Sequence, residues 1–174
     1  MILVIGYGNP LCGDDGIGPY AVEQLAQAGE NLRGDVEWLT VRQLTPELAE
    51  PISRAATVIF VDAADGETPG EMICHTLTAS KNQAKTVAGA FTHHVQPTVL
   101  LENAQLLYGQ RPLAAYLYTI TGKNFNLGDG FSPAIDLALP SFLDTLKRRI
   151  ADSQMFKLIL SAGQINIKAQ KHEI

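Results

Sequence analysis

Short apolar runs alternate with segments of helical periodicity along most of the chain. A continuous apolar run such as residues 1–5 is typical of a strand buried on both faces of a sheet. Apolar positions three or four residues apart, as in residues 17–28, predict an amphipathic helix. The strands predicted in this way span residues 1–5, 36–41, 57–61, 71–77 and 116–121. The predicted helices span residues 17–28, 46–52, 97–108 and 133–150.

Strands and helices in this order predict an α/β fold. We expect a three-layer αβα sandwich, in which a mostly parallel, twisted sheet of about five strands has helices on both faces. Residues 1–150 form a single α/β domain, which is an ordinary domain size. Pro140 lies inside the last helical pattern and predicts a kink or a second helix start. Residues 151–174 are predicted to be a C-terminal extension that is weakly ordered and has no catalytic role.

The composition and charge of the chain argue against several classes of function. Of the 174 residues, 46% are hydrophobic, which is enough for a substantial core. The formal net charge is −5 and no basic stripe is present, which argues against a nucleic-acid partner. No apolar run approaches the length of a membrane span, and the first residues form an apolar strand without a basic leader. We therefore expect a cytoplasmic monomer with no membrane partner.

A glycine-rich segment, residues 6–18, follows the first predicted strand and carries the adjacent carboxylates Asp14 and Asp15. A dinucleotide-binding loop would have glycine where Leu11 stands, and two acids at a helix start would repel a pyrophosphate. Capping of the following helix explains one aspartate but explains the pair poorly. The pair favours one acid as a cap and the other as a metal ligand or a base.

Polar residues also occur at the end of another predicted strand and just before a predicted helix. Asp62 directly follows the apolar run 57–61, and His93 and His94 precede the helix predicted at residue 97. Because the functional crevice of such folds lies beyond the carboxyl ends of the strands, we expect these residues to converge with the aspartate pair. One imidazole and two carboxylates form a set that binds a divalent metal and leaves a position for water or substrate. Such a metal polarises a carbonyl or activates water for hydrolysis.

Each of these residues also has other interpretations. Taken alone, Asp62 could equally well be a residue that caps a loop. A lone histidine before a helix is more often a structural residue held by hydrogen bonds. Cys12, in the glycine-rich segment, is an alternative nucleophile if a histidine and an aspartate accompany it.

The chain resembles the hydrogenase maturation proteases over about residues 1–150. The opening pattern of that family, G-x-G-N-x-L-x-x-D-[DE]-G-x-G after a strand, is matched by residues 6–18. Its strand ending in Asp-Ala is matched by residues 61–63, and its later histidine before a helix by residues 92–97. Residues 125–133 also look like a segment of the family.

The resemblance implies an endopeptidase that removes the C-terminal extension of the [NiFe]-hydrogenase large-subunit precursor after nickel insertion. It implies that Asp15, Asp62 and His93 contact metal, and that this metal is nickel carried by the precursor, with no permanent cofactor. The family often has glutamate where Asp15 stands, and His94 is the neighbouring alternative to His93.

Two other functions stay open at this point. Peptidyl-tRNA hydrolase also opens with a strand and G-x-G-N-P, as in residues 6–10, but that enzyme has glycine where Leu11 stands and carries an R-H-N segment that this chain lacks. The negative charge also fits tRNA poorly. A non-catalytic protein that binds the nickel-loaded precursor would have the same metal ligands.

Overall fold

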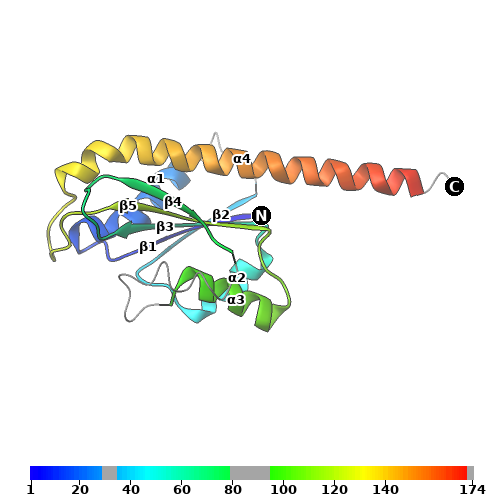
Figure 1. Cartoon of the computed structure of the whole chain (residues 1–174), viewed down its shortest axis with the longest axis horizontal. Coiled ribbons are helices and arrows are strands. Elements are labelled where there is room, and N and C mark those ends of the chain that lie inside the picture. The colour runs from blue at the N-terminus through cyan, green and yellow to red at the C-terminus, as the bar shows by residue number, and fades with distance from the viewer. Residues whose placement is uncertain (29–34, 79–94, 172–174) are drawn as a thin grey trace.

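The computed structural model describes residues 1–28, 35–78 and 95–171, with side chains described as far as residue 159. Within these residues, a five-stranded sheet with the order β2-β1-β3-β5-β4 forms the middle layer (Figure 1). β1, β2, β3 and β5 are parallel, whereas β4 pairs antiparallel with β5 at one edge. The predicted mostly parallel sheet is therefore confirmed. The strands are β1 Ile2–Tyr7, β2 Val36–Val41, β3 Thr57–Ala64, β4 Met72–Thr76 and β5 Ala114–Thr121.

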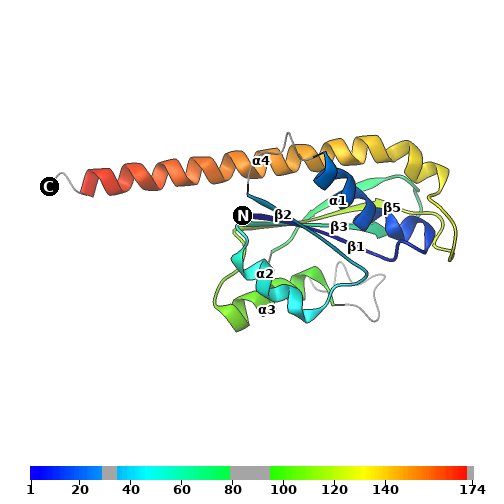
Figure 2. The same ribbon diagram turned by 180° about the vertical axis from the view of Figure 1, so that it is seen from behind.

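Helices cover both faces of the sheet, as expected. α1 and α4 lie on one face, and α2 and α3 lie on the other (Figures 1 and 2). Short 3₁₀ turns, η1 and η3, precede α1 and α2. The bounds are η1 Gly13–Gly16, α1 Ile17–Gln27, η3 Pro46–Leu48, α2 Ala49–Arg54, α3 Pro97–Tyr108 and α4 Pro133–Lys171.

Each face of the sheet has its own apolar core, because successive side chains of a strand point to opposite faces. In β1, Ile2 and Val4 belong to the core with α1 and α4, whereas Leu3 and Ile5 belong to the core with α2 and α3. All four side chains are buried. This burial on both sides explains the continuous apolar run at the start of the chain.

α4 is longer than the sequence pattern predicts. It passes Pro140 and runs on to Lys171 as one helix, so the prediction of a second helix start at Pro140 is wrong. Its last part extends well beyond the sheet (Figure 1). Met155, Leu158 and Ile159, on the same helix, are exposed. The weak order of residues 151–174 stays a prediction. None of the helices in the described ranges is long and apolar enough to cross a membrane.

The strand order reverses around β1. The chain passes from β1 to β2 on one side and then returns to β3 on the other, which makes the carboxyl end of β1 the topological switch point. β3 continues to Ala64, two residues beyond Asp62, where the strand was predicted to end. Pairing of β1 with β3 stops at Gly6 and Val61, and the next residues, Tyr7 and Asp62, stand at the switch point.

Candidate functional site

A small cavity of about 70 Å³ lies at the carboxyl ends of β1, β2 and β3. Asp15 from η1 and Asp62 from β3 both line it, so the structure brings together two of the three predicted ligands. The position is the switch point of the sheet, where α/β folds bind their ligands. Among the described residues, the cavity is lined by Tyr7, Gly8, Asp15, Arg42, Gln43, Leu44 and Asp62.

Asp62 is a buried carboxylate with an unsatisfied oxygen. The side chain is only 3% exposed, and its Oδ1 accepts a hydrogen bond from the backbone N–H of Ala63 at 2.8 Å. Its Oδ2 is buried and accepts no hydrogen bond from the described part of the chain. Such an oxygen is costly to bury, and a metal ion or a proton satisfies it.

The surroundings of Asp62 favour its protonated form when no metal is bound. Burial raises the pKa of Asp62 to about 7, and the negative charge of Asp15 adds to the rise. The Tyr7 hydroxyl and the Ala63 N–H act in the opposite direction but do not outweigh burial. A metal cation in the cavity would reverse this balance, because it favours the ionised carboxylate.

Tyr7 is a site residue that the sequence analysis did not find. Burial raises the pKa of Tyr7 well above its usual value, and the adjacent charge of Asp62 adds to this. The phenol therefore keeps its proton and faces the carboxylate as a donor group. Its only sequence signal is its place as the last residue of β1, at the switch point.

Asp15 is held by the loop that precedes it. Its Oδ2 accepts a hydrogen bond from the backbone N–H of Asn9 at 2.6 Å, which fixes the carboxylate at the wall of the cavity. Gly8 has φ +135°, and a Cβ at that position would lie 2.0 Å from the carbonyl oxygen of Asp15. Only glycine therefore lets the chain fold back closely enough to place Asp15 beside Asp62.

Asp14 has a different role from its neighbour and from the predicted helix cap. Its Oδ2 accepts hydrogen bonds from the backbone N–H groups of Lys123 and Asn124 at 2.7 and 3.0 Å, and its Oδ1 accepts one from Ser132 at 2.6 Å. Burial alone would raise its pKa, but these N–H groups lower it below the usual value. Asp14 thus ties the glycine-rich loop to the connection between β5 and α4, and the capping prediction is wrong.

The predicted third ligand, His93, and its neighbour His94 lie outside the described residues. The nearest described residue after them, Val95, packs against the apolar core under α2 and α3, just before α3 begins at Pro97. Residues 1–28, 35–78 and 95–171 contain no cluster of three metal-ligating side chains. Asp15 and Asp62 present two carboxylates, which would suit a divalent metal only with further ligands from elsewhere.

The alternative of Cys12 as a thiol nucleophile finds no support among the described residues. Its Sγ accepts a hydrogen bond from the Asn9 side-chain amide at 3.0 Å, and Cys12 is absent from the described lining of the cavity. The thiol therefore supports the loop that carries Asp15.

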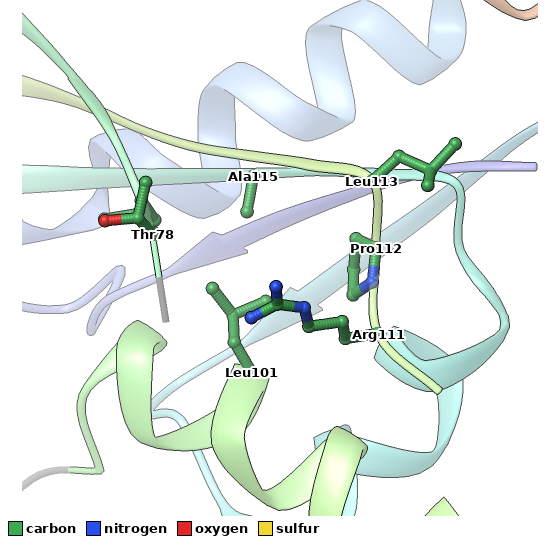
Figure 3. A pocket seen from close by; sticks show the side chains of 7 residues that line it. Thr78, Leu101, Arg111, Pro112, Leu113 and Ala115 are labelled. Atoms are coloured by element: carbon green, nitrogen blue, oxygen red, sulfur yellow. The ribbon is translucent and has the colours of Figure 1, made fainter. Parts of the chain in front are cut away.

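A larger cavity of about 180 Å³ lies at the opposite end of the sheet, where β5 begins. Figure 3 shows Arg111 and Leu101 facing this hollow, together with residues that flank the start of β5. Its described lining contains no carboxylate, histidine or thiol, so it offers none of the acid-base or metal-ligating groups found in the smaller cavity. Its described lining consists of Leu77, Thr78, Leu101, Arg111, Pro112, Leu113 and Ala115.

Neither a protein-family model nor a curated protein sequence matches the chain. Several solved structures do match. The solution structure of an endopeptidase from Escherichia coli has a TM-score of 0.71 at 24% identity, covering 87% of this chain and 93% of that one. The hydrogenase maturating endopeptidase HybD from E. coli has a TM-score of 0.66 at 23% identity, with the same coverage.

A third match is the [NiFe] hydrogenase maturation protease HycI from Thermococcus kodakarensis, with a TM-score of 0.67 at 20% identity over 86% of this chain and 92% of that one. Identities at this level establish a shared fold. The protein therefore has the α/β fold of the hydrogenase maturation proteases, and the resemblance stated from the sequence motifs is confirmed at the level of the fold.

Proposed function

We propose that this protein is an endopeptidase that removes the C-terminal extension of a [NiFe]-hydrogenase large-subunit precursor after nickel insertion. The observation that carries the proposal is the pairing of Asp15 and Asp62 at the switch point, with one oxygen of Asp62 buried and unsatisfied. The shared fold supports it, because the solved structures with this fold include a hydrogenase maturating endopeptidase and a [NiFe] hydrogenase maturation protease.

The nickel ion arrives with the precursor and is part of the substrate. Asp15, Asp62 and His93 complete its coordination, and the enzyme holds no resident cofactor. The volume of about 70 Å³ among the described residues is enough for a metal ion together with a few ligand atoms. The ligand set of two carboxylates and one imidazole leaves room for ligands that the precursor itself supplies.

Cleavage is a hydrolysis of the peptide bond at the start of the extension. Nickel polarises the scissile carbonyl or the attacking water. One of the two carboxylates accepts the proton of that water and returns it to the leaving amine. The Tyr7 hydroxyl lines the same cavity and stays protonated beside Asp62. Close approach of the substrate backbone is helped by Gly8, which carries no side chain at the cavity wall.

Replacing His93 with alanine is expected to abolish precursor processing, because the nickel loses the only imidazole of the proposed ligand set. Thermal melts of the variant and the wild type check that the fold is intact. The measurement is a gel assay of nickel-loaded precursor, with nickel-free precursor as the control. His94→Ala is the matched variant and should retain activity. Undiminished cleavage by His93→Ala would remove this histidine from the site.

The same assay separates this proposal from its rival of another class, a non-catalytic protein that binds the nickel-loaded precursor. That rival predicts binding without cleavage by the wild-type protein.

The proposed enzyme acts in the cytoplasm as a monomer, and the precursor is its partner. The similarity to solved maturation proteases favours this function over peptidyl-tRNA hydrolysis.

A further inference from the structure

The cavity that holds Asp15 and Asp62 is too small to bind a protein substrate by itself. Its volume of about 70 Å³ is well below the roughly 300–1,000 Å³ of ordinary ligand pockets. Affinity for a precursor protein must therefore come from the surface around the cavity. Hydrophobic side chains exposed beside the site are the first place to look for that surface.

Three large apolar side chains are exposed on the two loops that Asp14 joins. Leu11, in the glycine-rich loop, is 54% exposed, and Phe125 and Leu127, in the connection between β5 and α4, are 39% and 75% exposed. We name these three residues the apolar platform. Isolated exposed leucines are common, but a group of large apolar side chains on adjoining loops indicates an interaction surface.

Backbone hydrogen bonds hold the two loops of the platform together. The N–H of Gly128 donates to the carbonyl of Leu11 at 2.8 Å, and the N–H of Asp14 donates to the carbonyl of Asn124 at 2.8 Å. Within the second loop, the Asn124 side-chain amide donates to Asp129 at 2.7 Å. The two loops are therefore held against each other before any partner arrives, which lowers the entropy cost of ordering their backbone on binding.

The platform is continuous with the site. Leu11 lies in the short loop between Asn9 and Asp15, and the backbone N–H of Asn9 donates directly to the Asp15 carboxylate. The N–H of Asp15 in turn donates to the carbonyl of Cys12 at 3.1 Å, next to Leu11. A large protein that places its metal against Asp15 therefore comes to lie against the loop that carries Leu11.

We propose that the apolar platform is the docking surface for the folded precursor, and that it binds an apolar part of the precursor surface beside the nickel site. The inference rests on the proposed function and extends it from the reaction to substrate recognition. The continuity of the platform with Asp15 favours this occupant over a second copy of the chain. Burial of apolar side chains around a small polar centre is also the usual arrangement of a protein interface.

The test compares two double variants in the processing of nickel-loaded precursor. Leu11→Ser combined with Leu127→Ser removes most of the platform. Leu106→Ser combined with Leu113→Ser is the matched control, because these leucines are 81% and 73% exposed, on α3 and just before β5. The platform variant should raise KM at least tenfold and leave kcat within about twofold, whereas the control should change neither. Thermal melts of all proteins check that the folds are intact.

The outcomes separate the two proposals. Processing by the wild type together with an unchanged KM in the platform variant overturns the docking inference and leaves the proposed function standing. A fall in kcat at unchanged KM also overturns it, since the leucines would then act on the site and not on docking. A wild-type protein that cleaves no precursor overturns the proposed function and the docking inference with it. A concentration-dependent dimer that only the platform variant abolishes, with KM unchanged, assigns the surface to a second copy and overturns the docking inference.

Discussion

Replacing Asp62 with asparagine is expected to abolish precursor processing and to remove a pH dependence of stability. The amide keeps the shape of the carboxyl group, so the strand and its neighbours are undisturbed. It is a poor ligand for nickel and cannot accept the proton of the attacking water, so both proposed roles of Asp62 are lost. Loss of a positioned acid-base group alone costs about 10²–10⁴-fold in rate.

The effect on stability follows from the raised pKa. In the folded protein the pKa of Asp62 is about 7, compared with 3.8 as its ordinary value. Between these values the folded state keeps a proton that the unfolded state has released, so the free energy of unfolding falls as the pH rises from about 4 to about 7. At about 1.36 kcal/mol for each pKa unit, the total decrease in the free energy of unfolding is on the order of 4 kcal/mol. The decrease is complete above pH 7.

Urea unfolding of the metal-free wild type and of Asp62→Asn at pH 5 and pH 8 measures this loss. The wild type should lose more stability between the two pH values than the variant does. Asp65→Asn is the control, because Asp65 is exposed and lies three residues further along the chain. If the stability of the wild type and of Asp62→Asn depended equally on pH, the pKa of the Asp62 carboxyl group would not be raised. If the variant processed the precursor as fast as the wild type does, Asp62 would be excluded from the site.

Replacing Asp14 with alanine is expected to cause the largest loss of stability, although Asp14 takes no part in the chemistry. The substitution removes the acceptor of three backbone N–H groups, those of Lys123, Asn124 and Ser132. Hydrogen bonds to a charged group contribute about 1.5–3 kcal/mol each, and donors that stay buried without a partner add to the cost. We expect the free energy of unfolding to fall by about 3–5 kcal/mol at pH 7.

Chemical denaturation at pH 7 measures this fall, with Asp152→Ala as the control at an exposed aspartate. The pH dependence gives a second check. Because the pKa of Asp14 is lowered in the folded state, its stabilising effect is present above the ordinary pKa and is lost as the pH falls below about 4. The difference between the wild type and Asp14→Ala should therefore shrink in acid. A loss below about 1 kcal/mol at pH 7 would contradict the role assigned to these hydrogen bonds.

The fold could be predicted from the sequence because each strand and helix leaves a local pattern. The continuous apolar run of β1 reflects burial on both faces, and the spacing in residues 17–28 reflects one buried face of α1. The convergence of Asp15 and Asp62 could be predicted as well, because parallel strands present their carboxyl ends at one edge of the sheet. The placement of His93 stays a prediction.

The division of roles between Asp14 and Asp15 could not be predicted from local sequence. The hydrogen-bond partners of Asp14 are 109 to 118 residues away, so nothing near it in the chain marks it as structural. Tyr7 escaped notice because an aromatic residue at the end of an apolar strand has the pattern of a core residue. The length of α4 was missed because Pro140 and Gly163 are usual signs of a helix boundary, and the helix passes both.

Lys123, Asn124 and Ser132 donate hydrogen bonds to Asp14 from a distant part of the chain. These bonds also bear on when, during synthesis and folding, the loop that carries Asp15 is held in place. The bond from Ser132 can form only after the chain up to the start of α4 has been synthesised and has folded back onto the N-terminal loop. Contacts between such distant segments form late in folding, because the entropy of closing the intervening chain opposes them. A nascent or truncated polypeptide that ends before Ser132 would therefore carry both carboxylates but lack α4 and one of the three bonds that hold Asp14.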